Sequence, residues 1–106
     1  MKSEKTGDKL IIYLHGEIDH CSAQSLRSEI EKMLQDPHIK RLIMDFSRVS
    51  FMDNSGIGMI IGRYKTMTAR QGHVFARGMR PEVERLFRMA GLHRIIAQEK
   101  TEEQKA

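Results

Sequence analysis

Apolar and polar residues follow one another in short, regular blocks along the chain. Four compact apolar runs, bounded by turn-forming or charged residues, predict β-strands at residues 10–14, 41–46, 73–76 and 94–97. A polar stretch at residues 3–6 can add a short edge strand before the first of them. The pattern therefore indicates several short strands separated by longer segments.

Three of the longer segments have apolar residues spaced three and four apart, which is typical of helices that pack along one face. Their expected bounds are Asp19 to Asp36-Pro37, Ser55 to about Arg70, and Pro81 to Gly91. Their inner faces are expected to contain Leu26, Ile30, Met33 and Leu34; Ile57, Ile60, Ile61 and Tyr64; and Val83, Leu86, Phe87 and Ala90.

Alternating strands and helices predict an α/β fold with a small, mostly parallel sheet and helices packed on it. A chain of 106 residues supports one modest core, so we expect a single domain over residues 1–106. Residues 98–106 are too polar to bury and are expected to form a loose tail or a frayed helix.

The turn at residues 53–56, Asp-Asn-Ser-Gly, lies between a buried strand and an amphipathic helix. Asp, Asn and Ser are common at helix starts, because their side-chain oxygens accept hydrogen bonds from free backbone N–H groups. The simplest interpretation of Ser55 is therefore a helix N-cap. Asp53 can serve as a cap or can orient the Ser55 hydroxyl.

Three glycines in the same helix need a further explanation. Gly56, Gly58 and Gly62 each cost up to about 1 kcal/mol relative to alanine in a helix interior. Gly58 and Gly62 are four residues apart, so they share a stripe, which differs from the apolar one. Such a stripe indicates either a docking surface for another molecule or very close packing inside the protein.

Composition narrows the class of protein. The formal charge of +4 comes from basic residues that are spread along the chain among acidic ones, without the basic stripe that nucleic acids require. No apolar run approaches the roughly 18 residues of a membrane span, and no signal peptide follows Met1. Cys21 is the only cysteine. We expect a cytoplasmic protein with no DNA, RNA or membrane partner.

Catalytic and metal-binding patterns are weak. Ser55 has no histidine near it in sequence to act as a base, and residues 56–62 lack the Gly-Lys-Ser/Thr ending of a phosphate-binding loop. His20 and Cys21 are adjacent, so they cannot easily share one tetrahedral metal site. The sequence therefore predicts no enzyme, metal or cofactor, although nucleotide binding or hydrolysis remains an alternative to be tested with ATP or GTP alone.

Two further groups deserve separate interpretation. Met33, Met44 and Met89 fall on expected inner faces and are interpreted as core residues. Met59 falls off the apolar stripe, so it either contacts a partner or packs under a neighbouring segment. Asp19 precedes the first helix and is interpreted as a cap or as a partner contact.

Several motifs resemble those of a known family. Residues 51–58, Phe-Met-Asp-Asn-Ser-Gly-Ile-Gly, with residues 62–65, Gly-Arg-Tyr-Lys, resemble the phosphoserine motif of the anti-anti-sigma factors, which are STAS-domain antagonists of anti-sigma factors. Residues 16–20, 85–87 and 91–92 extend the similarity over nearly the whole chain. Asn54 stands where sporulation members often carry a second serine, which leaves one hydroxyl in the turn.

The resemblance implies a STAS-type fold, a small mixed sheet with helices mainly on one side. It also implies that the unphosphorylated chain binds an anti-sigma factor, which is also an ATP-dependent serine kinase, and thereby releases a sporulation sigma factor. Phosphorylation of Ser55 would end binding, and a serine phosphatase would reverse it. The implied partner-binding residues are Glu17, Asp19, His20, Asp53, Asn54, Gly56, Ile57, Gly58, Met59, Gly62 and Arg63. A STAS module of another partner-switching pathway, such as the general stress response, remains an alternative.

Overall fold

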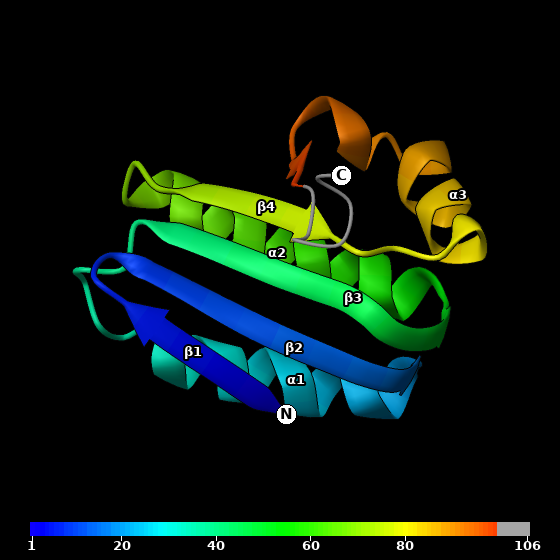
Figure 1. Cartoon of the computed structure of the whole chain (residues 1–106), viewed down its shortest axis with the longest axis horizontal. Helices are drawn as coiled ribbons and strands as arrows, with labels where there is room; N and C mark the ends of the chain where they lie inside the picture. Colours follow the sequence, from blue (N-terminus) through cyan, green and yellow to red (C-terminus); the bar gives the residue numbers. More distant parts are fainter. Residues whose placement is uncertain (100–106) are drawn as a thin grey trace, which may run out of the picture.

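A five-stranded sheet forms the centre of the computed structural model, which describes residues 1–99 (Figure 1). Its strands lie in chain order, with β1 antiparallel to β2 and the other neighbours parallel. They are β1 (Lys2–Thr6), β2 (Lys9–Ile18), β3 (Arg41–Met52), β4 (His73–Arg77) and β5 (Ala97–Gln98). The edge strand anticipated near residues 3–6 is therefore present.

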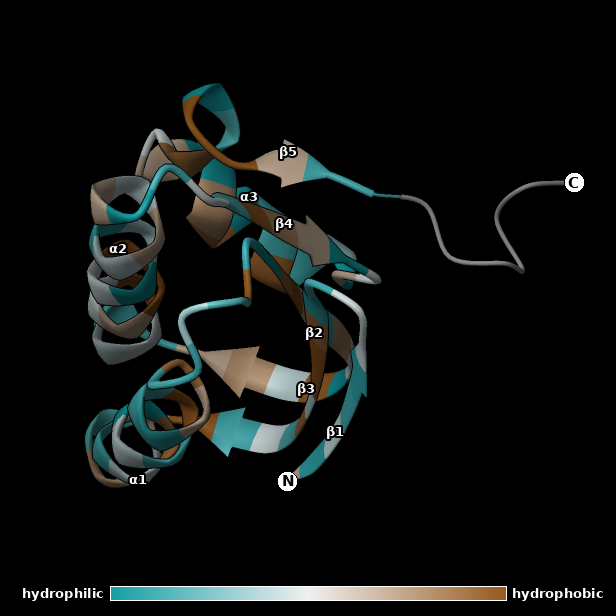
Figure 2. Ribbon diagram, turned by 90° about the vertical axis from the view of Figure 1, so that its left-hand side faces the viewer, coloured by the Kyte–Doolittle hydropathy of each residue, from teal (hydrophilic) through white to brown (hydrophobic). Residues whose placement is uncertain are grey.

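The helices lie mainly on one side of this sheet. They are α1 (His20–Met33), α2 (Asn54–Ala69) and α3 (Pro81–Met89), with a short 3-10 turn, η1 (Leu92–Arg94). Figure 2 shows α1 and α2 side by side over the same face, and α3 near β4. This confirms the predicted α/β class with a mixed, mostly parallel sheet. In the part of the chain described, none of the helices has both the length and the apolar character needed to cross a membrane.

Alternating residues of the strands supply the core under the helices. Leu10, Ile12 and Leu14 of β2 and Leu42 and Met44 of β3 are all buried there. Both strands are longer than predicted. Their parallel pairing continues, through two irregularities in register, as far as the last residue of each strand. The apolar runs identified the centre of each strand but not this extension into polar sequence.

The end of the described chain differs from the prediction. Arg94 lies in η1 and the last strand is Ala97–Gln98, so the strand predicted at 94–97 is displaced. The backbone N–H of Glu99 donates to the carbonyl of Ala76 at 2.7 Å, so residues 98 and 99 are attached to the sheet and are not a loose tail. The rest of the predicted tail, residues 100–106, lies outside the described residues.

Two predicted core positions in α3 are wrong. Val83 and Phe87 are buried, but Met89 is 78% exposed and Ala90 is also exposed. The helix ends at Met89, where Gly91 adopts a left-handed conformation and turns the chain away. The last turn of α3 therefore extends past the sheet instead of covering it.

A polar network occupies the opposite face of the sheet. Asp45 and Arg77 face each other on neighbouring strands, and Nε of Arg77 lies 2.8 Å from Oδ2 of Asp45. The other carboxylate oxygen accepts hydrogen bonds from the backbone and the hydroxyl of Ser47. Burial raises the pKa of Asp45, but the bonds from Ser47 and Arg77 outweigh burial, so the pKa lies below its ordinary value of 3.8.

Replacing Asp45 with asparagine is expected to lower the free energy of unfolding at pH 7 by about 2–4 kcal/mol, because the largely buried Arg77 loses its closer counter-ion and keeps only Glu99, whose Oε1 lies 3.6 Å from its Nη1. Since the pKa of Asp45 is lowered by folding, its contribution is complete above 3.8 and declines as the pH falls below that value. Urea unfolding at pH 7 and at about pH 3 measures this. Asp8→Asn is the control, because Asp8 and Arg41 form an exposed pair. Equal losses in the two variants would contradict the prediction.

Candidate functional site

The starts of α1 and α2 are brought together by the ends of β2 and β3. Ile18 and Met52, the last residues of these strands, are paired neighbours, and each helix begins two residues later. The N–H of Asp53 also donates to the carbonyl of Ile18 at 3.1 Å. The loop at residues 17–20 and the turn at residues 53–55 therefore lie at the same edge of the sheet.

An aspartate caps each helix. Oδ1 of Asp19 accepts from the N–H of Ser22 at 3.0 Å, and the Ser22 hydroxyl accepts from the N–H of Asp19, which completes a capping box. Hydrogen bonds from the backbone N–H and the hydroxyl of Ser22 to the Asp19 carboxylate lower the pKa of Asp19. In α2, Oδ1 of Asp53 accepts from the N–H of Ser55 at 2.8 Å. The capping interpretation of both aspartates is confirmed, whereas that of Ser55 as the N-cap is wrong.

Ser55 occupies the first turn of α2 and is partly exposed. Its side chain helps to line a hollow of about 300 Å³ between α1 and α2. The hollow is lined by His20, Ala23, Gln24, Arg27, Ser55, Gly58 and Met59. A hydroxyl group in this position can be approached from outside the molecule, which modification by another protein requires.

The glycines of α2 divide into two kinds. A Cβ atom added to Gly58 or Gly62 would meet nothing within 4 Å, so these two residues face open space. A Cβ atom on Gly56 would lie 2.3 Å from Cγ of Met52, so Gly56 is needed for internal packing. Of the two interpretations given for the glycines of α2, close packing therefore applies to Gly56 and not to the stripe of Gly58 and Gly62. Gly58 and Gly62 leave the backbone of α2 accessible from outside.

Four predicted partner-binding residues are buried in the chain itself. Gly56 and Ile57 pack toward the core, and Met59 is 3% exposed between the helices. Arg63 is 5% exposed. Little of these four residues is exposed in the free chain, and Gly56 has no side chain, so their contact with a partner stays a prediction. Of the two interpretations of Met59, internal packing is the correct one.

The remaining predicted contacts are accessible. Glu17, His20, Asn54 and Gly58 are exposed, and Asp19, Asp53 and Gly62 are partly exposed. Gln24 and Arg27 also line the hollow but were not predicted as site residues. Their spacing from His20, four and seven residues, places all three on one face of α1, and this signal was present in the sequence.

Arg63 is held in the seam between the two helices. Its Nε lies 3.0 Å from Oε1 of Glu31, outside hydrogen-bonding geometry, and its buried Nη1 has no hydrogen-bond partner among residues 1–99. Burial and the nearby Arg27 lower the pKa of Arg63, while Glu31 acts against them. Glu31 also accepts a hydrogen bond from the hydroxyl of Thr66 at 2.9 Å. The Glu31 carboxylate is therefore shared by the guanidinium group of Arg63 and the hydroxyl of Thr66.

Replacing Glu31 with glutamine is expected to destabilise the protein by about 2–3 kcal/mol, because Arg63 keeps a buried charge without its counter-ion. Adding Arg63→Met should recover most of that loss, because the charge is then removed as well. Chemical denaturation of the single and double variants measures the loss and its recovery. Glu29→Gln, which removes an exposed carboxylate of α1, is the control. A double variant no more stable than Glu31→Gln would contradict the explanation.

A second hollow, about 340 Å³ in volume, lies between the end of β3 and α3. Phe51, which is 50% exposed, and Met89, which is 78% exposed, line it. Within the described residues, no group of three or more His, Cys, Asp or Glu side chains is placed to hold a metal ion. The candidate site is therefore the hollow between α1 and α2 that Ser55 itself helps to line.

A family model for the STAS domain matches residues 1–105. The chain belongs to the STAS-domain family. This confirms the resemblance found in the sequence motifs. An anti-sigma F factor antagonist from Paenibacillus polymyxa is 33% identical to this STAS domain over 87 residues, which cover 82% of the chain and 74% of that protein. An anti-sigma-B factor antagonist from Listeria monocytogenes is 32% identical over 93 residues, covering 88% and 81%.

Solved structures agree with this assignment. The anti-sigma factor antagonist SpoIIAA in its unphosphorylated form superposes with a TM-score of 0.83 at 31% identity, covering 97% of this STAS domain and 90% of that chain. The Bacillus cell fate determinant SpoIIAA in its phosphorylated form superposes with a TM-score of 0.76 at 30% identity, covering 97% and 93%. The fold of this STAS domain is therefore that of SpoIIAA.

Proposed function

We propose that this STAS domain is an anti-sigma factor antagonist that acts by binding and has no catalytic activity of its own. The names of its relatives and the structural likeness to SpoIIAA support this role. The observation that carries the proposal is the pairing of one partly exposed serine with a side-chain-free stripe on the same helix. A cytoplasmic location, with access to a sigma factor, is part of the proposal.

In this mechanism the unphosphorylated chain presents the Ser55 turn and the bare stripe of Gly58 and Gly62 to the anti-sigma factor. The exposed residues around them, Glu17, Asp19, His20 and Asn54, surround the contact. Without side chains on the stripe, the partner can pack directly against the backbone of α2. The anti-sigma factor then releases its sigma factor.

Phosphorylation of Ser55 reverses the switch. The partner acts as an ATP-dependent serine kinase, and a separate phosphatase removes the phosphate. A phosphoserine carries about −1.5 to −2 charges. The first turn of α2 tolerates an anion, with a gain of very roughly 0.3–1 kcal/mol. Buried against a partner without a matching basic pocket, the same dianion costs several kcal/mol. The partner is therefore released with little change in this fold.

The test is to mix the purified chain with the candidate anti-sigma kinase and ATP, and to map the modified residue by mass spectrometry. Phosphate is expected on Ser55 and is expected to disappear in Ser55→Ala, which should still bind the partner. Phosphorylation at another residue, or persistence of the mark in Ser55→Ala, would overturn the proposal. ATP or GTP turnover by the chain alone would favour nucleotide hydrolysis instead.

A second candidate is supported by the relatives. An anti-sigma-B factor antagonist is nearly as similar as the anti-sigma F factor antagonist, 32% against 33% identity. We propose the sporulation role because the motifs at residues 16–20, 51–58, 85–87 and 91–92 resemble most closely those of the sporulation members. Competition between purified F-type and B-type anti-sigma factors for the chain separates the two. Preferential binding of the B-type factor would assign this STAS domain to the general stress response.

A further inference from the structure

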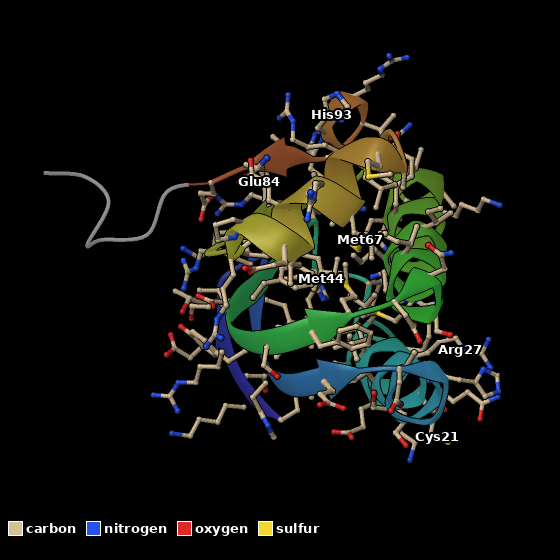
Figure 3. The ribbon with its side chains drawn as sticks, turned by 90° about the vertical axis from the view of Figure 1, so that its right-hand side faces the viewer. Cys21, Arg27, Met44, Met67, Glu84 and His93 are labelled. Atoms are coloured by element: carbon tan, nitrogen blue, oxygen red, sulfur yellow. The ribbon has the colours of Figure 1, made fainter. Side chains whose placement is uncertain are left out.

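The hollow between α1 and α2 has an unusual charge for a surface next to a modified residue. Two basic side chains line it, His20 and Arg27, and no acidic residue does. Among residues 1–99, neither of these two side chains has a hydrogen bond or an ion pair. Figure 3 shows Arg27 at the boundary between α1 and α2. The hollow is therefore a basic surface without a counter-ion.

The surrounding charges leave this basic character in place. Deeper in the seam, Arg27 lies close enough to Arg63 to lower its pKa, while Glu31 supplies the one carboxylate beside them. At the other end, the Asp53 carboxylate accepts the N–H of Ser55, and that of Asp19 accepts the N–H of Ser22. Neither aspartate lines the hollow, and both carboxylates accept hydrogen bonds from backbone N–H groups at the helix starts.

The hollow also has room for a bound group. Its volume of about 300 Å³ is roughly ten times the share of one water molecule. Gly58 borders it and contributes no side chain, and an added Cβ there would meet nothing within 4 Å. Ser55 and Gly58 therefore border the same open hollow as Arg27 and His20.

We propose that this hollow is the internal binding site for the phosphoryl group on Ser55, with Arg27 and His20 of α1 as its ligands. The inference rests on the proposed phosphorylation of Ser55. In the phosphorylated chain the dianion turns inward along the seam, where Arg27 donates charge-assisted hydrogen bonds to it. His20 adds a further donor from the first turn of α1.

Binding of the phosphate in this hollow has two effects on the surface that this chain presents to its partner. The dianion is stabilised on its own chain, which prevents a partner's arginine from capturing it as a new attachment point. The ordered Arg27 side chain then occupies the edge of the bare stripe and narrows the approach to Gly58. Release of the partner thus results from steric exclusion as well as from charge repulsion.

The experiment installs phosphoserine at position 55 during synthesis, so that no kinase or partner is needed. The second pKa of the phosphate is followed by phosphorus-31 NMR in the phosphorylated chain and in its Arg27→Gln and Arg88→Gln variants. Arg88 is an exposed arginine on α3, away from the hollow, and provides the matched loss of charge.

The phosphate in the parent chain is expected to titrate below the ordinary value of about 6. Arg27→Gln should raise that pKa by about 0.5 unit or more, whereas Arg88→Gln should leave it nearly unchanged. The side-chain Nε signal of Arg27 should also shift when Ser55 is phosphorylated. Equal pKa values in the two variants, together with an unshifted Arg27 signal, would overturn the site. Failure of a kinase to modify Ser55 would contradict the proposed function and leave this result untouched.

Discussion

Leucine in place of Gly58 is expected to reduce anti-sigma factor binding by roughly 100-fold or more, about 3 kcal/mol, while leaving the isolated chain at least as stable. The two effects have separate causes. Leucine is a better helix residue than glycine by up to about 1 kcal/mol, and the position faces open space, so folding has no reason to suffer. A partner that packs directly on the backbone of α2 would meet a bulky side chain at the centre of its contact.

Isothermal titration calorimetry with the anti-sigma factor and thermal unfolding of the free variant measure the two effects. Gly62→Leu should behave in the same way. Gly56→Ala is the contrasting control, because its Cβ would collide with Met52 and should destabilise the fold by about 1–3 kcal/mol. If Gly58→Leu and Gly62→Leu bind with parental affinity, the stripe is not the docking surface.

The secondary structure could be predicted from the chain because local physics determines most of it. Apolar runs such as residues 10–14 and 41–46 form strands with one face under the helices, and the predicted helix starts agree with the observed ones within a residue or two. Asp19 and Asp53 were recognisable as candidate caps, since a cap satisfies backbone groups only a few residues away. Features that depend on residues close together in sequence could therefore be predicted.

Features that depend on residues distant in sequence but close in space could not be predicted from the sequence. The apolar stripe of α2 predicts one buried face, but α2 contacts both the sheet and α1, so Met59 and Arg63 are buried as well. A helix that packs against two elements buries a wider arc than its own periodicity marks. Arg63 was predicted as a partner contact from the family resemblance, whereas Glu31, distant in sequence, lies beside it in the buried seam.

The candidate site shows the same division. The glycine stripe was found because glycine is unfavourable in a helix interior, and the Ser55 turn because its motif resembles the phosphoserine motif of the family. The hollow beside them could not be found in that way, since it requires α1 and α2 to lie together. The groove at Phe51 likewise depends on the position of α3, whose exposed end at Met89 was predicted to be core. The sequence thus identified the residue proposed to be phosphorylated, and the fold showed which residues surround it.

Ser55→Asp is expected to weaken binding to the anti-sigma factor by roughly 100-fold, because a carboxylate at the docking surface must lose its water without gaining a matched partner. Ser55→Ala should bind like the parent chain, which shows that the hydroxyl itself is not needed. Ser3→Asp adds the same charge on the exposed edge strand β1 and should have little effect.

The test is to measure the dissociation constants of the parent chain and the three variants for the anti-sigma factor, at low and at high salt. Charge repulsion alone would be largely screened by salt, whereas the cost of desolvation persists, so most of the loss should remain at high salt. Full affinity of Ser55→Asp would show that negative charge at this turn does not control the partner.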